Sequence, residues 1–245
     1  ASIAADGNAA LQARVNEARI GLDFATLEFY RLNKSGFPLS DVQNINKRIA
    51  RFTSATTAQG IKIINEMGLP LTDYLQGYQH LVTNSKEVNL AKNAKVNLAI
   101  KPVKYAKEDP QALTDGAFGG WSFYANWLGF LDDMKATIDL GAVTNFSQVS
   151  VSFLQVTNHV VFFPTAVTFE ASEDGINYTP IQSVDNVFPL AKTSKVNDIQ
   201  VFTTTLKSQK ARFIRVTGKN MKSPPYWHNA AGTGAWIFAD EIVVK

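Results

Sequence analysis

The chain of 245 residues is long enough for one large domain or two of ordinary size. With 45% hydrophobic and 18% charged residues it can form a packed core, which excludes a disordered chain. The formal net charge of +3 is too small for a surface that tracks phosphates, so we expect no nucleic-acid partner. There is no cysteine, which excludes disulfides, thiolate metal sites and a cysteine nucleophile.

The hydropathy and the start of the chain bear on its compartment. No apolar run approaches the roughly 20 residues that a helix needs to span a bilayer, so a membrane partner is not expected. The sequence begins at Ala1 without a Met or a signal peptide, and we interpret it as a processed protein or an excised piece. The absence of cysteine is compatible with the cytoplasm and with the bacterial envelope.

The first third of the chain, from residue 8 to about residue 83, has the apolar period of helices. The first helix is expected to begin near the N-cap candidates Asp6–Asn8 and to end at Gly36 and Pro38. Its predicted buried stripe recurs at steps of three and four residues. This stripe consists of Leu11, Val15, Ala18, Leu22, Ala25 and Phe29.

Two more helices are expected, one opening at Ser40 and one from Leu69 to Val82, and we interpret Thr53–Met67 as mostly helical. The apolar positions of the second helix are Val42, Ile45, Ile49 and Phe52, and those of the third include Tyr74, Leu75, Tyr78 and Leu81. Charged residues of this region could line a site, but such residues usually occupy an exposed face, and we expect a solvated surface. They are Arg14, Glu17, Arg19, Asp23, Glu28, Arg48 and Arg51.

A change of period divides the chain. The polar stretch from Ser85 to Asn93 separates the helical pattern from a region in which apolar residues recur every second position. We therefore predict an α-helical domain at residues 1–88 and an antiparallel β-sandwich, or jelly roll, at residues 89–245. The strand candidates are 135–140, 146–154, 166–171, 199–206, 212–217 and 236–244, and a turn is expected at Ser172–Gly175.

Five short stretches of the β region follow the order of a known family. They are NLAIKPV near Asn97, TDG at 114–116, ATIDLG at 136–141, VTFEASEDGINYTPI at 167–181 and ARFIRVTG at 211–218. In this order they resemble a discoidin domain, the coagulation factor 5/8 type C family, which includes the family 32 carbohydrate-binding modules. The resemblance covers residues 89–245 and implies a galactose-binding-like jelly roll with its ligand site on loops at one end.

Longer stretches extend the resemblance to a particular kind of parent protein. WLGF at 127–130 and YWHNAAGTGAWIFADEI at 226–242 are similar to the C-terminal discoidin domain of Bacteroidetes β-hexosaminidases, or chitobiases. The segment at 14–33 is similar to the helical region that follows the catalytic barrel in large Bacteroidetes glycoside-hydrolase-like proteins. The resemblance thus implies an exported protein, whether periplasmic, outer-membrane-associated or secreted, with a catalytic domain of the same polypeptide that is absent from this chain.

Aromatic side chains on Gly-rich loops are the candidate binding residues, because a pyranose needs a flat apolar surface with polar groups beside it. We expect the loops around 119–130 and 219–235 to meet at one rim of the jelly roll and bind an oligo- or polysaccharide. The candidates are Trp121, Tyr124, Asn126, Trp127, Tyr226, Trp227, His228 and Asn229. Trp127 and Phe130 are alternatively packing residues, while Trp236, His80 and His159 are interpreted as structural.

The resemblance also implies one structural calcium ion. Asp115 of the Asp-Gly turn and Glu241 on the last strand occupy the matching positions, and backbone carbonyls would have to complete the shell of six to eight oxygens. The threonine usual in the family after the turn is absent, with Ser122 the nearest hydroxyl. The alternative is that Asp115 closes a turn and Glu241 forms a salt bridge.

Catalysis is not expected from this chain. Glycoside hydrolysis needs two opposed carboxylates in a cleft, and the roughly 250 residues of a barrel are not present. The predicted function is glycan binding by a non-catalytic accessory part of a glycoside hydrolase. Two alternatives stay open, namely a purely structural spacer and a discoidin module for phospholipid or protein.

Overall fold

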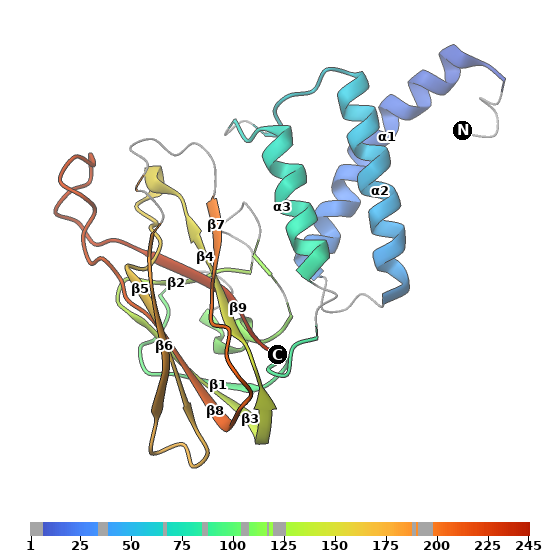
Figure 1. Ribbon diagram of the computed structural model, residues 1–245. Coiled ribbons are helices and arrows are strands. Elements are labelled where there is room, and N and C mark those ends of the chain that lie inside the picture. The colour runs from blue at the N-terminus through green and yellow to red at the C-terminus, as the bar shows by residue number, and fades with distance from the viewer. Residues whose placement is uncertain are drawn as a thin grey trace. The chain divides into compact units, whose positions relative to one another are not determined.

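The computed structural model describes residues 7–33, 39–65, 68–84, 88–103, 108–116, 118–119, 126–187, 190 and 198–245. The chain divides into two compact units, Ala1–Thr83 and Asn84–Lys245 (Figure 1). The first unit contains the helices and the second contains the β-strands.

The described residues of the first unit form three helices: α1 (Ala9–Asn33), α2 (Leu39–Ala58) and α3 (Leu71–Asn84). The Asn8 side chain accepts a hydrogen bond of 3.0 Å from the amide of Leu11, which is the expected N-cap geometry. None of the described helices is long and apolar enough to cross a bilayer. Residues 59–65 are not helical, so the prediction for Thr53–Met67 is right only as far as Ala58.

Aromatic rings form the core of the helical unit. Tyr74 of α3 packs against Phe24 of α1 and Phe52 of α2, with ring centroids 5.6 and 5.9 Å apart. The hydroxyl of buried Tyr78 donates a hydrogen bond of 2.6 Å to the carbonyl of Leu27, which removes the cost of burying that hydroxyl. Ile45, Ile49 and Phe52 are buried together, so the face predicted for the second helix is confirmed for these three residues.

The predicted buried stripe of α1 is wrong. Its members Leu22 and Phe29 are 68% and 58% exposed, whereas Asp23, Leu27 and Tyr30 are buried on the other side of the helix. Both sides of α1 carry apolar residues, so spacing alone could not tell which side faces α2 and α3.

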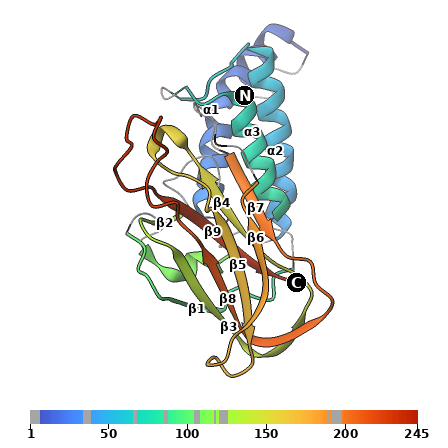
Figure 2. The same ribbon diagram turned by 60° about the vertical axis from the view of Figure 1, so that its left-hand side comes forward.

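The second unit is a sandwich of two antiparallel sheets, seen in Figures 1 and 2, which confirms the predicted β-sandwich. One sheet has the strand order β1-β3-β8-β5-β6 and the other β2-β9-β4-β7. Their bounds are β1 Lys95–Leu98, β2 Leu128–Phe130, β3 Met134–Phe146, β4 Val149–Gln155, β5 Ala166–Ser172, β6 Thr179–Asp185, β7 Asp198–Thr203, β8 Gln209–Gly218 and β9 Ile237–Val244. Two short 3-10 helices, η4 (Pro110–Leu113) and η5 (Thr157–His159), lie in the connections.

The main core lies between the sheets and is built from the alternating apolar residues of their facing sides. All eight residues of β9 are buried, so this strand is covered on both faces. The segment 146–154 was expected to be one strand, but Phe146 ends β3 and Val149 begins β4. The amides of Ser147 and Gln148 between them both donate to the carbonyl of Lys245, which fixes the turn to the end of the chain.

Candidate functional site

The loop that joins β8 to β9, residues 219–235, is called the rim loop here. Asn220, only 2% exposed, anchors it from within. Its amide N–H donates to Asp133 Oδ1 at 2.9 Å, and its Nδ2 donates to the carbonyl of Ala235 at 2.9 Å. Its Oδ1 accepts from the amide of Lys222 at 2.7 Å. One buried residue, through its backbone amide and its side chain, thus ties both ends of the rim loop to each other and to the turn after β2.

Lys222 fastens the rim loop a second time. Its Nζ forms an ion pair with Asp133 Oδ1 at 2.7 Å and another with Asp132. Hydrogen bonds from Lys222 and from the amide of Asp133 hold the pKa of Asp132 below its ordinary value. Lys222 has a positive φ of 68°, a conformation that is costly for a residue with a Cβ. Because of the two ion pairs, the charge of Lys222 is already engaged by Asp132 and Asp133.

His228 holds the middle of the rim loop. The side chain is 8% exposed, Nε2 lies 2.8 Å from the carbonyl oxygen of Thr157, and Nδ1 accepts a hydrogen bond of 3.0 Å from the amide of Ala230. This pair of contacts fits the neutral tautomer with its proton on Nε2. Both ring nitrogens are engaged, so the predicted role of His228 in contacting a ligand is not supported, and its place is in the scaffold.

Three candidate residues of the rim loop are presented to solvent. Tyr226 is 92% exposed, Asn229 is exposed, and Trp227 is half-buried with its ring 6.1 Å from that of His228. A tyrosine this exposed contributes almost nothing to the core. The rim loop therefore combines a fixed backbone with a free aromatic ring, an indole face beside it and an amide.

Two adjacent carboxylates on β9 hold a second loop, residues 114–119. Glu241, fully buried, accepts hydrogen bonds from the amide of Gly116 at 3.1 Å on Oε1 and 3.0 Å on Oε2, and its Oε1 also accepts from Asn89 Nδ2 at 3.0 Å. Asp240, also fully buried, accepts from the amide of Gly119 at 2.7 Å. Sequence reasoning missed Asp240 and Asn89, although an Asp-Glu pair inside an apolar strand is itself a signal for buried polar partners.

The buried Glu241 bears on the predicted calcium ion. Calcium needs six to eight oxygen ligands, and both oxygens of Glu241 already accept N–H hydrogens. Asp115 is half-buried in the same turn. No cluster of three acidic or histidine side chains suited to a metal occurs in the part of the chain that the structure describes. The described donors thus form a hydrogen-bonded anchor for the loop, and the calcium ion stays a prediction, because residues 117 and 120–125 lie outside the described residues.

Trp127 is part of the core and not of a binding surface. It is 0% exposed in a small cluster with Leu154, Val156, Val161 and Phe238. A Cβ added at Gly119 would lie 2.1 Å from Trp127 Cε2, so a glycine is needed where this loop crosses the indole. The ligand role predicted for Trp127 is therefore wrong, and the alternative of a packing residue holds.

Asn126 faces its own loop. It is half-buried with a positive φ of 61°, and its Nδ2 lies 3.4 Å from the carbonyl of Phe118. Trp121 and Tyr124 lie outside the described residues, so the expected meeting of the two loops is described only in part. The rim loop does contact the turn after β2, because Asn220 bonds Asp133, and it contacts η5, because His228 bonds Thr157.

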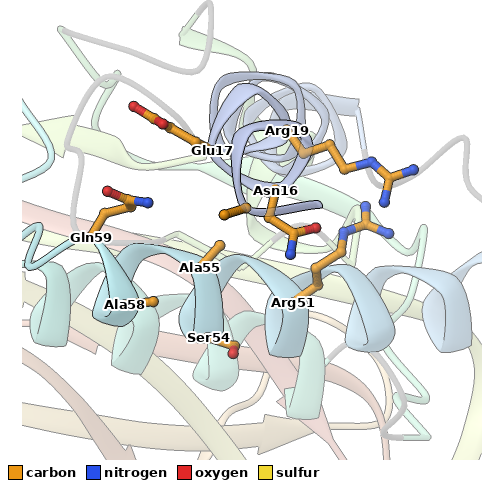
Figure 3. Close-up of a pocket in the computed structure, with 9 residues that line it drawn as sticks. Asn16, Glu17, Arg19, Arg51, Ser54, Ala55, Ala58 and Gln59 are labelled. Carbon is orange, nitrogen blue, oxygen red and sulfur yellow. The ribbon is translucent and has the colours of Figure 1, made fainter. Parts of the chain in front are cut away.

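The helical unit has a separate polar groove between α1 and α2, with a cavity volume of about 330 Å³ (Figure 3). Asn16, Glu17 and Arg19 of α1 face Arg51 and Gln59 of α2 across it. The small side chains of three alanines and one serine complete its lining.

Asp23 pairs with Arg51 of this groove and is 1% exposed, so the prediction of a solvated face is wrong for Asp23. Its carboxylate accepts hydrogen bonds from Arg48 Nη1 at 2.6 Å and Arg51 Nε at 2.7 Å, and it is also bonded by Arg51 Nη2. Burial alone raises the pKa of Asp23, but the hydrogen bonds and charges of Arg51 and Arg48 outweigh it, so the pKa lies below its ordinary value.

The family model described as F5/8 type C domain matches residues 93–237, more than half of the chain and all of it within the β unit. The chain belongs to the F5/8 type C family. A comparison with curated proteins finds no match for it.

A comparison with solved structures finds chains that are similar to part of this chain. One is chitosan-binding module 1 of the chitosanase/glucanase from Paenibacillus sp. IK-5, with 16% identity, a TM-score of 0.44 and coverage of 65% of this chain and 99% of that module. Another is CpGH89CBM32-6 from Clostridium perfringens, with 19% identity, a TM-score of 0.41 and coverage of 64% and 98%. A Ruminococcus gnavus GH29 fucosidase has 16% identity and a TM-score of 0.43, and the match covers 72% of this chain but 31% of that enzyme.

Proposed function

We propose that the F5/8 type C domain binds a glycan on the rim loop, with Tyr226 as the stacking surface. The observation that carries this proposal is a 92% exposed tyrosine on a loop whose backbone is anchored by Asn220, Lys222 and His228. An exposed ring on a rigid loop loses little conformational freedom when a ligand covers it. The C–H face of a pyranose is the kind of flat apolar surface that such a ring covers.

The neighbours of Tyr226 supply the polar contacts that a sugar requires. Asn229 offers an amide donor and acceptor for hydroxyl groups, and the half-buried Trp227 offers a second ring face. Trp121 and Tyr124 remain proposed members of the same surface. The predicted affinity is weak, because one or two stacked rings and a few hydrogen bonds must offset the cost of association.

The rim loop favours glycan over the phospholipid alternative. A discoidin module for anionic lipid needs apolar side chains ringed by free basic residues. Lys222 is paired with Asp132 and Asp133, so of the two lysines on the rim loop only the exposed Lys219 offers a charge outside these ion pairs. The structural-spacer alternative gives no reason for an exposed tyrosine at this place.

We further propose that the chain is the C-terminal, non-catalytic part of an exported glycoside-hydrolase-like protein of the chitobiase type. The motifs at 127–130 and 226–242 and the helical segment at 14–33 support this proposal. A weak glycan-binding module helps such an enzyme by keeping it near a polymer, since linkage raises the effective concentration of substrate. The isolated chain should show no turnover of aryl glycosides, and clear hydrolysis would overturn this proposal.

The experiment that tests glycan binding is a glycan-array screen of the purified chain, with sedimentation of phosphatidylserine vesicles in parallel. The Tyr226→Ala variant and a matched control, Ile176→Ala, are screened beside the parent chain. Ile176 is 81% exposed but lies in the β5–β6 turn, at the opposite end of the sandwich. We expect array signals for the parent and the control and their loss in Tyr226→Ala. Vesicle binding without glycan binding would instead support the lipid alternative.

A further inference from the structure

The turn that follows β4, residues 156–162 and called the η5 turn here, is closed by its own backbone. The amide of Val156 donates to the carbonyl of Val161 at 2.9 Å, and the amide of Val161 donates to the carbonyl of Val156 at 3.3 Å. Between them, the amide of Val160 donates to the carbonyl of Thr157 at 3.0 Å and ends the 3-10 helix. The η5 turn is therefore a compact unit whose backbone groups bond one another.

Two carbonyls of the η5 turn also bond the rim loop. Nε2 of His228, in the middle of the rim loop, bonds the carbonyl of Thr157 at 2.8 Å. The amide of Trp236, directly after the rim loop, donates to the carbonyl of Val160 at 2.8 Å. Phe162 adds a third contact, because its amide donates to the carbonyl of Trp236 at 2.9 Å and its ring lies edge-on to that of His228 at 5.8 Å. The η5 turn thus determines where the second half of the rim loop lies.

Val160 closes the η5 turn in a backbone conformation that is costly for valine. Its φ of 63° and ψ of 21° lie in the left-handed region. Glycine and asparagine adopt this region readily, whereas a β-branched residue there is an outlier because its side chain crowds the backbone. The other described non-glycine residues with positive φ are not β-branched: Asn93, Glu108, Asn126 and Lys222. Local conformational preference therefore does not explain a valine at position 160.

A second unfavourable feature lies three residues earlier in the same turn. Thr157 is 0% exposed, and its hydroxyl oxygen Oγ1 has no hydrogen-bond partner among the described residues. A buried hydroxyl without a partner lowers stability, and a valine would occupy nearly the same volume without that loss. Two residues of one short turn thus oppose local stability. Such residues gather where the backbone is held in one conformation for a function.

The valine side chain also limits how far the η5 turn can move. A glycine at position 160 would adopt the same φ without strain, but it would leave the backbone free to visit several other conformations. A β-branched side chain restricts the backbone around it. Once the hydrogen bonds of the turn hold Val160 in the left-handed region, the two carbonyls that bond His228 and Trp236 keep their directions. Tyr226, two residues before His228, is then held in place as well.

We propose that Val160 is a positioning residue for the glycan surface: its left-handed conformation fixes the η5 turn, and the turn fixes the rim loop that carries Tyr226. A loop that is ordered before binding loses less conformational freedom when a sugar covers it. This inference rests on the proposed function for its ligand, whereas the order of the rim loop can be measured without a glycan.

Hydrogen exchange of the Trp236 amide, followed by NMR, measures the order of the rim loop, because this amide donates to the carbonyl of Val160. Val160→Gly should make the exchange faster, and Val160→Ile, which keeps the β-branch, should exchange like the parent chain. The matched control is Ile176→Gly, which places a glycine at an exposed position of the β5–β6 turn and should leave the exchange unchanged. An unchanged rate in Val160→Gly would overturn the proposal, whether or not the chain binds a glycan.

Isothermal titration with a glycan that the parent chain binds on the array measures the consequence for affinity. Val160→Gly should raise the Kd about three- to tenfold, because binding must then order the loop. Its thermal midpoint should stay within about 3 °C of the parent value, since relief of the strain offsets the added freedom of the unfolded chain. Thr157→Val removes the unpaired hydroxyl, so it should raise the thermal midpoint and leave the Kd unchanged.

The two measurements separate this proposal from the proposed function. Faster exchange in Val160→Gly with an unchanged Kd would overturn the positioning role of Val160. Weaker binding by Val160→Ile, equal to that of Val160→Gly, would overturn it too, because the β-branch would then not be what matters. A parent chain that binds no glycan would refute the proposed function instead, and the exchange rates would still decide whether Val160 orders the rim loop.

Discussion

Replacing His228 by alanine separates a scaffold role from a ligand role. The substitution removes a buried imidazole that bonds the carbonyl of Thr157 and the amide of Ala230. Each lost hydrogen bond costs about 1 kcal/mol, and a buried group left unpaired costs about 1–3 kcal/mol. Because water can reach part of the 8% exposed site, we expect the free energy of unfolding of the β unit to fall by roughly 2–3 kcal/mol.

Urea denaturation followed by tryptophan fluorescence measures this loss, because all four tryptophans lie between residues 121 and 236. His228→Gln is the informative second variant, since an amide can replace one of the two hydrogen bonds and should recover part of the stability. The exposed neighbour Asn229, changed to alanine, serves as the control and should leave stability unchanged. If His228→Ala keeps full stability and only loses glycan binding, the scaffold role is refuted.

Three further predictions follow from buried contacts. Gly119→Ala should lower the free energy of unfolding of the β unit by about 2–4 kcal/mol, because the Cβ of the new alanine would lie 2.1 Å from Trp127. A change below about 0.5 kcal/mol in urea denaturation would contradict this contact. Asp23→Asn should lower the urea midpoint of the helical circular-dichroism signal and leave the transition seen by tryptophan fluorescence in place. The free energy of unfolding of the helical unit should fall by about 2–3 kcal/mol, a value that allows for the 32% and 45% exposure of Arg48 and Arg51. The hydrogen bond from Arg212 lowers the pKa of Asp139 to about 2, so the stabilising effect of the Asp139 carboxylate is complete above about pH 4 and is lost as the pH falls toward 2. Asp139→Asn should therefore lower the free energy of unfolding by about 1 kcal/mol at pH 7 and by almost nothing at pH 2. Equal losses at both pH values would contradict the ion pair.

The strand pattern could be predicted because one face of most strands is buried. Ala166–Ser172 and Gln209–Gly218 alternate clearly, and the structure pairs them in the same sheet. The break between β3 and β4 was missed, although Ser147 and Gln148 are two polar residues in a row and interrupt the alternation. What ends the strand there is a pair of hydrogen bonds to Lys245, almost a hundred residues away in the sequence.

For the aromatic residues of the candidate site, the sequence could not show which rings are buried and which are exposed. Tyr226 and Trp127 are both aromatic residues near glycines, and the sequence does not tell them apart. Tertiary contacts decide between them: Trp127 is enclosed by Gly119 and Phe238, while nothing covers Tyr226 among the described residues. Composition predicts that rings lie on these loops, but only packing decides which ring reaches solvent.

Buried carboxylates were the least predictable feature. Asp23 has the helical spacing of a surface residue, and its burial depends on two arginines from another helix. Glu241 was expected to bind calcium, and in the structure it holds the amide of Gly116, 125 positions earlier in the chain. The partners of these buried carboxylates come from distant parts of the sequence and are brought near by the fold. The local sequence therefore shows the carboxylate but not the group that it bonds.

Isothermal titration with the glycan that gives the strongest array signal tests the central claim most directly. Covering the face of Tyr226 removes about 50 Å² of apolar surface from water, worth roughly 1.3 kcal/mol at 25 cal/mol/Å². Tyr226→Ala should therefore raise the Kd about tenfold, while Tyr226→Phe, which keeps the ring, and Ile176→Ala should change it less than about twofold. An unchanged Kd in Tyr226→Ala would contradict the account, because the rim loop would then not be the surface that holds the sugar.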